Sequence, residues 1–419
     1  PPAGGAADTG GNADTGGSGG ALEGGSGGGD DEEIGGTAGV PNEPDGTPIL
    51  EQPLDGGYAC DVDEPLSLPK LPGSGALVAG EAPSLFWSDT QDKVIRGATL
   101  DAAMAGVPYT VHDSQGNTYT LAAARNGDSI TLLWEEADGT TRRLYSAQAN
   151  DAGEVVTEAH VLPGATPINA GAALVPFRDG YAAVWVEGGG EESLMRFASL
   201  DAEGELVGSP KTLLEGNVAR IDALVALEDA FALSYTGFDI KQFSAFVAFD
   251  AEGAPYREPI VLGEPGVGLI RRGDYVVAAW SVGTGDPGSA WASNLRIGRF
   301  DDRGRPVGDV FELQAAVLHE QNWLPAWVAV GDDLGLVWSR GGVIYVCGGC
   351  IPDDHLEFVV LDGDTLARKS ELVTIENQET SGGLLRSRIV ASGSGLTIAT
   401  NVTYHVTAEA ALATLTCTP

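Results

Sequence analysis

The sequence predicts an all-β fold, a β-propeller of about seven four-stranded blades. The first indication is a sequence motif that repeats with variation: an apolar residue or Asn, then Asp, then a turn of small residues or Gly, then an extended stretch. The second is its period of roughly 45 to 60 residues, filled only by strand signals, which is typical of repeat architectures. The copies begin at residues 100, 150, 200, 249, 300 and 361.

One repeat unit divides into four short strands. Residues 167–215 read INAGAALVPFRD, GYAAVWVE, SLMRFASLD and ELVGSPKTLL, with apolar runs or alternation in each segment and turn residues between them. The units that follow repeat this order. We therefore expect blades at residues 73–113, 118–163, 167–215, 217–262, 265–314, 323–375 and 385–417, the last joined by 47–53.

An aromatic residue marks the second strand of six units. A large side chain between adjacent blades is what such a ring packs, so we interpret most of these residues as core. The positions are Trp87, Trp134, Trp185, Tyr235, Trp280 and Trp338.

The two ends of the chain predict how the ring closes. The last unit runs out of sequence before its outer strand, and TPILEQP at 47–53 resembles the missing one. Sharing one blade between both ends removes an open seam with unpaired strand edges. Cys60 and Cys417 should then meet and form a disulfide, which by chain entropy alone would contribute on the order of 5 kcal/mol. Four cysteines in two pairs indicate an oxidising compartment.

The composition indicates a separate N-terminal segment and limits the partners. Residues 1–40 contain sixteen Gly and very few large apolar side chains, so we expect residues 1–45 to be a disordered acidic tether before a propeller at 46–419. The net charge of −37 argues against nucleic acid as a partner, because phosphate binding needs a basic face. No apolar run is long enough to span a membrane.

The repeats, the tether and the cysteines together resemble the cell-surface propeller lipoproteins of Gram-negative bacteria. The phrase FDDRGRPVGDVFEL after AAWSVG is especially similar to their repeat, and the resemblance covers about residues 47–419. It implies an extracellular or outer-membrane location, with a lipidated Cys expected just upstream of Pro1. A secreted protein without an anchor is the alternative.

Long connections are concentrated in units five to seven. They cover residues 281–293, 313–323, 340–355 and 374–387 and leave the strands on one side, where propellers usually bind partners. We take from them Trp291, His319, Trp323 and His355 as candidate ligand-binding residues. Cys347 and Cys350 are interpreted first as a disulfide that pins a long hairpin, with a metal site and a redox pair as alternatives. Asp353 and Asp354 would suit calcium, the only cofactor considered, although adjacent acids in a loop are often simply solvated.

The central channel is the second candidate site. Its innermost strands are expected to carry Arg220, Asp222, Arg386 and Arg388, and clustered arginines suit a carboxylate or sulfate. Ion pairing with the surplus acids is the simpler interpretation. Glycosidase chemistry needs two carboxylates across a cleft, and Asp222 alone stands out.

The sequence thus favours a non-catalytic surface module that binds a protein or glycan through units five to seven. A carbohydrate-active hydrolase or lyase at the channel mouth is the first alternative. A subunit of an extracellular assembly is the second.

Overall fold

The computed structural model describes most of the compact unit Ala38–Pro419. The described residues are 44, 46–54, 57–63, 66–67, 75–89, 91–100, 107–239, 241–284, 292–315, 320–342, 355–375, 385–392, 395–402 and 411–419. The expected tether at 1–45 lies outside them, apart from residue 44.

The described strands form seven antiparallel sheets, so the predicted all-β class and seven blades are confirmed. Blade 1 contains β3 (Gly75–Val78), β4 (Ser84–Asp89), β5 (Val94–Thr99) and β6 (Tyr109–Asp113). Blade 2 contains β7 (Asn117–Asn126), β8 (Ser129–Asp138), β9 (Thr141–Asn150) and β10 (Val155–Val161). Blade 3 contains β11 (Pro167–Phe177), β12 (Gly180–Glu187), β13 (Leu194–Leu200) and β14 (Leu206–Glu215).

The remaining blades follow the same order. Blade 4 contains β15 (Val218–Ala226), β16 (Ala230–Phe238), β17 (Gln242–Asp250) and β18 (Ile260–Gly263). Blade 5 contains β19 (Val267–Arg272), β20 (Tyr275–Gly283), β21 (Ser293–Phe300) and β22 (Pro306–Gln314). Blade 6 contains β23 (Glu320–Val330), β24 (Asp333–Gly342), β25 (His355–Leu361) and β26 (Val373–Ile375). Blade 7 contains β27 (Leu385–Ser392), β28 (Gly395–Val402) and β29 (Ala411–Thr418), together with β1 (Ala59–Val62) and β2 (Leu66–Ser67).

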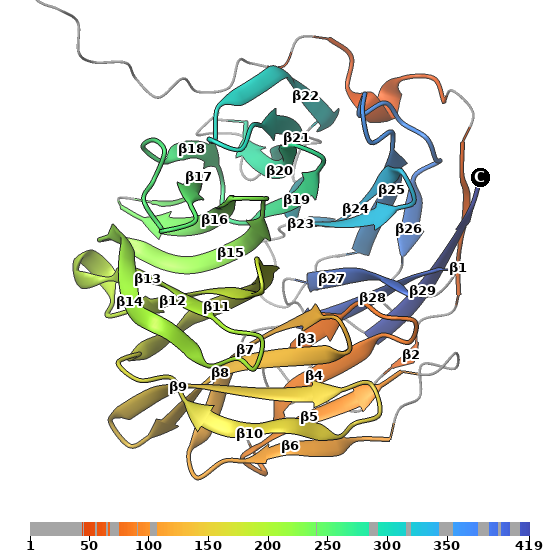
Figure 1. Cartoon of the computed structure of the whole chain (residues 1–419). Helices are drawn as coiled ribbons and strands as arrows, with labels where there is room; N and C mark the ends of the chain where they lie inside the picture. The colour runs from red at the N-terminus through yellow and green to blue at the C-terminus, as the bar shows by residue number, and fades with distance from the viewer. Residues whose placement is uncertain are drawn as a thin grey trace, which may run out of the picture. The chain divides into compact units, whose positions relative to one another are not determined.

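The first strand of each blade lies at the middle of the ring. These inner strands contact one another in the cyclic order β3, β7, β11, β15, β19, β23, β27 and back to β3 (Figure 1). Each is the terminal strand of its sheet and is hydrogen-bonded to a neighbour on one side only. The channel is therefore bordered by seven unpaired sheet edges.

The core fills the space between adjacent blades. Trp134, Trp185 and Trp338 are completely buried, and the other three second-strand aromatics are at most 8% exposed, which confirms their predicted core role. Trp338 packs with Val277 and Ile297 of blade 5, so its ring bridges two sheets. Sheets stacked in this way bury apolar area on both faces, as repeat architectures require.

The recurrent Asp forms a turn between the third and fourth strands. The Oδ1 atom of Asp301 accepts hydrogen bonds from the backbone N–H groups of Arg303 (3.0 Å) and Arg305 (2.8 Å). Asp201 and Asp250 make the equivalent pairs of bonds. An Asp side chain that replaces backbone partners in this way stabilises a tight turn.

The glycine of the same turn packs on the preceding blade. Gly253 has a φ of +86°, a conformation that L side chains rarely adopt, and a Cβ there would lie 3.0 Å from Leu213 Cδ2. Gly304 has a φ of +74° and approaches Ala248. The repeated phrase thus describes the contact by which each turn docks on its neighbour.

A serine at the start of the third strand links consecutive blades. The Oγ atoms of Ser193, Ser244 and Ser293 accept hydrogen bonds from the N–H groups of Val218 (2.8 Å), Gly266 (2.9 Å) and Asn322 (2.9 Å), respectively. Each donor belongs to the next blade or directly precedes its inner strand. These buried bonds satisfy edge groups that would otherwise be unpaired.

The predicted closure by an N-terminal strand and a disulfide is confirmed, but the strand is not residues 47–53. β1 pairs with β29, and Cys60 is bonded to Cys417 (Figure 1). Residues Ile49–Glu51 instead form a short 3-10 helix, η1. Pro48 and Pro53 lack an N–H group and cannot support a ladder, whereas Ile49 is buried in the core between blades 5 and 6.

Two side-chain contacts fix the N-terminal segment to blade 6. Arg368 Nη1 donates to the backbone oxygen of Leu50 at 2.9 Å, and the Tyr58 hydroxyl donates to Asp333 Oδ2 at 3.0 Å. The segment therefore runs from the blade 5–6 interface to the outer edge of blade 7.

Candidate functional site

The connections predicted to bind a partner fall largely outside the described residues. This holds for six candidates: Trp291, His319, Cys347, Cys350, Asp353 and Asp354. Their roles, including the Cys347–Cys350 disulfide and a calcium ion at the two acids, remain predictions. Trp323 is half-buried on β23.

Charged side chains meet where β24 ends and β25 begins. His355 Nε2 lies 3.5 Å from Glu357 Oε1, and Arg340 Nη1 lies 2.7 Å from the same oxygen. Burial raises the pKa of Glu357, but hydrogen bonds and charge from His355 and Arg340 outweigh it, so this pKa lies below its usual range. The adjoining ends of β24 and β25 are thus joined by an ion cluster around the buried Glu357.

In the channel, the structure brings two of the four predicted inner-strand residues together. Arg220 Nε donates to Asp222 Oδ1 at 2.7 Å, and Thr236 donates to Asp222 Oδ2 at 2.8 Å. The Asp222 side chain is only 5% exposed. For this arginine, the simpler interpretation as a partner of a nearby acid is confirmed. Arg386 and Arg388 lie on β27 opposite Asn401 and Ala399, and their side chains lie outside the description.

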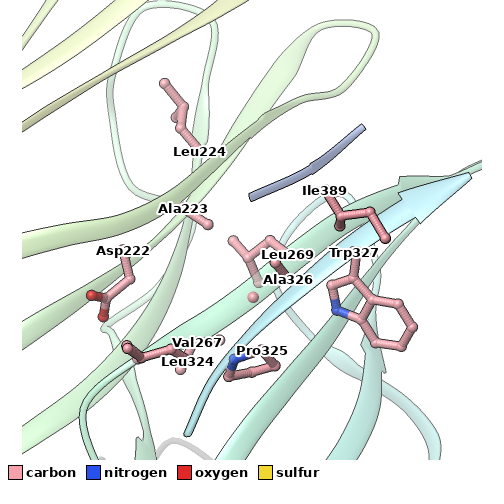
Figure 2. A pocket seen from close by; sticks show the side chains of 12 residues that line it. Asp222, Ala223, Leu224, Val267, Leu269, Leu324, Pro325, Ala326, Trp327 and Ile389 are labelled. Carbon is pink, nitrogen blue, oxygen red and sulfur yellow. The ribbon is translucent and has the colours of Figure 1, made fainter. Parts of the chain in front are cut away.

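A cavity of about 210 Å³ lies among four inner strands (Figure 2). β15 contributes residues 222–224, β19 contributes 267–269 with the preceding Gly266, β23 contributes 324–327 and β27 contributes Ile389. Asp222 is the one charged side chain among these lining residues, and it lies at one side of the view with Trp327 at the other.

The sequence reasoning missed the β23 side of this cavity. Leu324 has a φ of +48°, and the pairing of β23 with β24 shifts register between Trp323 and Ala326. The tetrapeptide LPAW carried the available signal, because Pro inside a strand pattern marks an edge or a bulge.

Neither a metal centre nor a membrane-spanning helix is found in the part of the chain that the structure describes. No group of three or more His, Cys, Asp or Glu side chains there could hold a metal ion. No helix in that part of the chain is long and apolar enough to cross a membrane.

No family model matches the chain, and no curated protein matches it. Among solved structures it is similar to the β-propeller domain of the Trilobed protease from Pyrococcus furiosus, described as having an open velcro topology. That match has 12% identity, a TM-score of 0.39, and covers 68% of this chain and 78% of the other.

Two viral structures match at a comparable level. One is a subtype N11 neuraminidase-like protein of A/flat-faced bat, with 11% identity, a TM-score of 0.44, and coverage of 79% of this chain and 99% of the other. The other is a subtype N10 neuraminidase-like protein of A/little yellow-shouldered bat, with 9% identity, a TM-score of 0.41, and coverage of 67% and 96%. The fold assignment rests on the strand pairing above.

Proposed function

We propose that the chain is a non-catalytic recognition module that binds a protein or glycan through the connections of blades 5–7. The observation that carries the proposal is the unequal length of the links between second and third strands. Residues 343–354 join β24 to β25, and residues 284–292 join β20 to β21, whereas residues 239–241 suffice between β16 and β17. Long connections on a rigid ring are where such folds place recognition.

The state of Asp222 supports binding over hydrolysis. Its two carboxylate oxygens accept hydrogen bonds from Arg220 and Thr236, so it acts as a structural anion within blade 4. Most glycosidases use a free pair of carboxylates that face the scissile bond from two sides. Among the cavity-lining residues there is no second carboxylate.

The Cys60–Cys417 disulfide supports a location in an oxidising compartment. We place the module at the surface of a Gram-negative bacterium, held there by a lipid anchor through the Gly-rich segment. This placement follows the resemblance of the repeats to surface lipoproteins. It is tested by fractionating source cells and analysing the N-terminus of the mature protein by mass spectrometry.

The experiment that tests recognition replaces residues 343–354 by Asp-Ile-Lys, the link that blade 4 uses. The intact chain and the variant are each used to capture partners from a surface extract and from a glycan array. Tyr275→Ser is the matched control. Tyr275 is exposed at the β19–β20 turn of blade 5, at the opposite end of the strands from the connections between second and third strands. Urea unfolding of all three proteins verifies that they fold.

Loss of capture in the shortened variant alone would support the proposal. Equal capture by all three proteins would exclude residues 343–354 as the site. If none of the proteins captured a partner, the recognition module itself would be refuted, and turnover assays comparing the intact chain with Asp222→Asn would follow.

A further inference from the structure

The cavity among β15, β19, β23 and β27 has unusually polar walls for the centre of a protein. Alternate residues of a strand that is paired on one side direct N–H and C=O groups away from the sheet, here toward the channel. Some of these groups are already satisfied, because the Val267 carbonyl accepts a bond from Ser234 Oγ at 2.9 Å. The walls still combine free backbone edges with the carboxylate of Asp222 and the side chains of Leu224, Leu269 and Ile389.

Two β-bulges open into this one cavity. In β15 the register shifts between Ile221 and Ala223, which makes Asp222 the extra residue. In β23 it shifts between Trp323 and Ala326, which leaves Leu324 and Pro325 unpaired. β19 and β27, the other two walls, pair without a shift. Inner strands β7 and β11 shift register as well, so bulges recur around the ring, and two of them border this cavity together with Leu324 at φ +48°.

The charge of the cavity selects against ions. Asp222 is paired with Arg220 at 2.7 Å, so the described side chains of the walls carry no excess charge for a cation. Anions are disfavoured by the net charge of −37 on the whole chain. The chemistry that remains is a neutral molecule that can donate and accept several hydrogen bonds.

The volume of the cavity gives room for a single ring. A cavity of about 150 Å³ holds benzene, and drug-sized ligands fill about 300 Å³ or more, so 210 Å³ suits one substituted six-membered ring. Trp327 closes one side (Figure 2). An aromatic wall beside hydrogen-bonding groups is suited to a sugar, which has apolar faces and a hydroxyl-bearing rim.

We propose that this cavity is a binding site for a neutral monosaccharide. The backbone groups of the strand edges bind the hydroxyl groups, and Trp327 with the aliphatic walls packs on the ring. The site is distinct from the connections of blades 5–7, so it does not depend on the function proposed above.

Calorimetric titration, supported by ligand-observed NMR, tests the site with D-glucose, D-galactose and N-acetyl-D-glucosamine as neutral probes. D-glucuronate and D-glucosamine are the charged counterparts. Cyclohexanol tests whether a six-membered ring binds without the several hydroxyl groups of a sugar. Ala326→Leu and Ala223→Leu fill the cavity from two different strands. Ala329→Leu is the matched control, because Ala329 is exposed on the same strand, β23.

We expect at least one neutral sugar to bind the intact chain and Ala329→Leu equally. At least one folded cavity-filling variant should weaken that binding by about tenfold or more. Tighter binding of a charged sugar or of cyclohexanol would overturn the proposal. So would binding unchanged in the folded filled variants, or no binding of any neutral sugar. The 343–354 replacement should leave sugar binding intact, which separates this test from the test of recognition.

Discussion

Cys60 lies directly opposite Cys417 in the ladder between β1 and β29, and the two sulfur atoms are bonded across 357 residues of sequence. The disulfide thus joins strands that are already backbone partners. It closes the ring at its outer edge, whereas the contact of β27 with β3 closes it at the centre.

We expect the double variant Cys60→Ser/Cys417→Ser to lose about 2–5 kcal/mol of unfolding free energy, because its denatured chain is no longer constrained by the link. Urea unfolding measures the loss. With a reductant present, the wild type and the variant should show the same midpoint. Equal stability of the variant and the oxidised wild type would show that strand pairing alone holds the seam.

Asp301→Ala should cost about 2 kcal/mol, because two backbone N–H groups and the Arg305 side chain lose a charged acceptor. Asp302→Ala is the control, since this neighbour is exposed, and its effect should stay within about 0.5 kcal/mol. Thermal unfolding compares the two. Similar losses in both variants would contradict the turn interpretation.

Gly253→Ala should destabilise more than Gly308→Ala, although both residues have a positive φ. A methyl group at Gly308 meets nothing within 4 Å, so that variant incurs only the backbone strain of roughly 1–2 kcal/mol. At Gly253 the methyl group also presses on Leu213, which adds about 1 kcal/mol or more. Equal free energies of unfolding would mean that the turn does not pack tightly on the preceding blade.

Ser293→Ala should cost about 1–3 kcal/mol, because the buried N–H group of Asn322 loses its acceptor at 2.9 Å. Ser209→Ala serves as the control, since Ser209 is exposed on β14. Hydrogen exchange at the Asn322 amide is a second readout. Protection that is unchanged in Ser293→Ala would refute a linking role for this serine.

Acid should weaken the fold partly through Asp362. Hydrogen bonds from the backbone and hydroxyl of Thr365, with others from Asp364 and Lys369, lower the pKa of Asp362 from 3.8 to about 2. A carboxyl group with a lowered pKa stabilises the folded state above its unfolded pKa, and the contribution disappears as the pH falls toward 2. Discounted for partial exposure, it is on the order of 1–2 kcal/mol. Asp362→Asn should flatten the pH dependence of urea unfolding between pH 4 and 2, and an unchanged slope would refute the assignment.

The part of the fold that could be predicted from the sequence depends on interactions between residues close together in the chain. The side chains of Asp201, Asp250 and Asp301 accept hydrogen bonds from residues only two and four positions ahead. Each turn therefore has a short sequence motif that can be recognised. The seam was predictable because a propeller that lacks one outer strand must take it from the other end. Which N-terminal segment supplies that strand was not predictable, since an apolar TPILEQP suits a strand or a buried turn equally.

The cavity shows why the candidate site was predicted less well. Arg220 and Asp222 were visible as charges two positions apart on an inner strand, a spacing that places both on one face, but the sequence does not mark the bulge at Asp222. Leu324 and Trp327 line the cavity because β23 departs from regular pairing at Pro325. That departure depends on how β19 and β23 approach each other, where a Cβ on Gly268 would lie 2.3 Å from the Pro325 oxygen.

The pairing of β1 with β29 also determines when the ring can close during synthesis. Residues 59–62 precede the other described strands, and their partners, residues 415–418 of β29, follow all of them. A chain emerging during synthesis therefore lacks the outer closure of the ring until β29 arrives. We expect nascent chains that stop short of residue 411 to be sensitive to proteases. Resistance to proteases should appear only when β29 is complete.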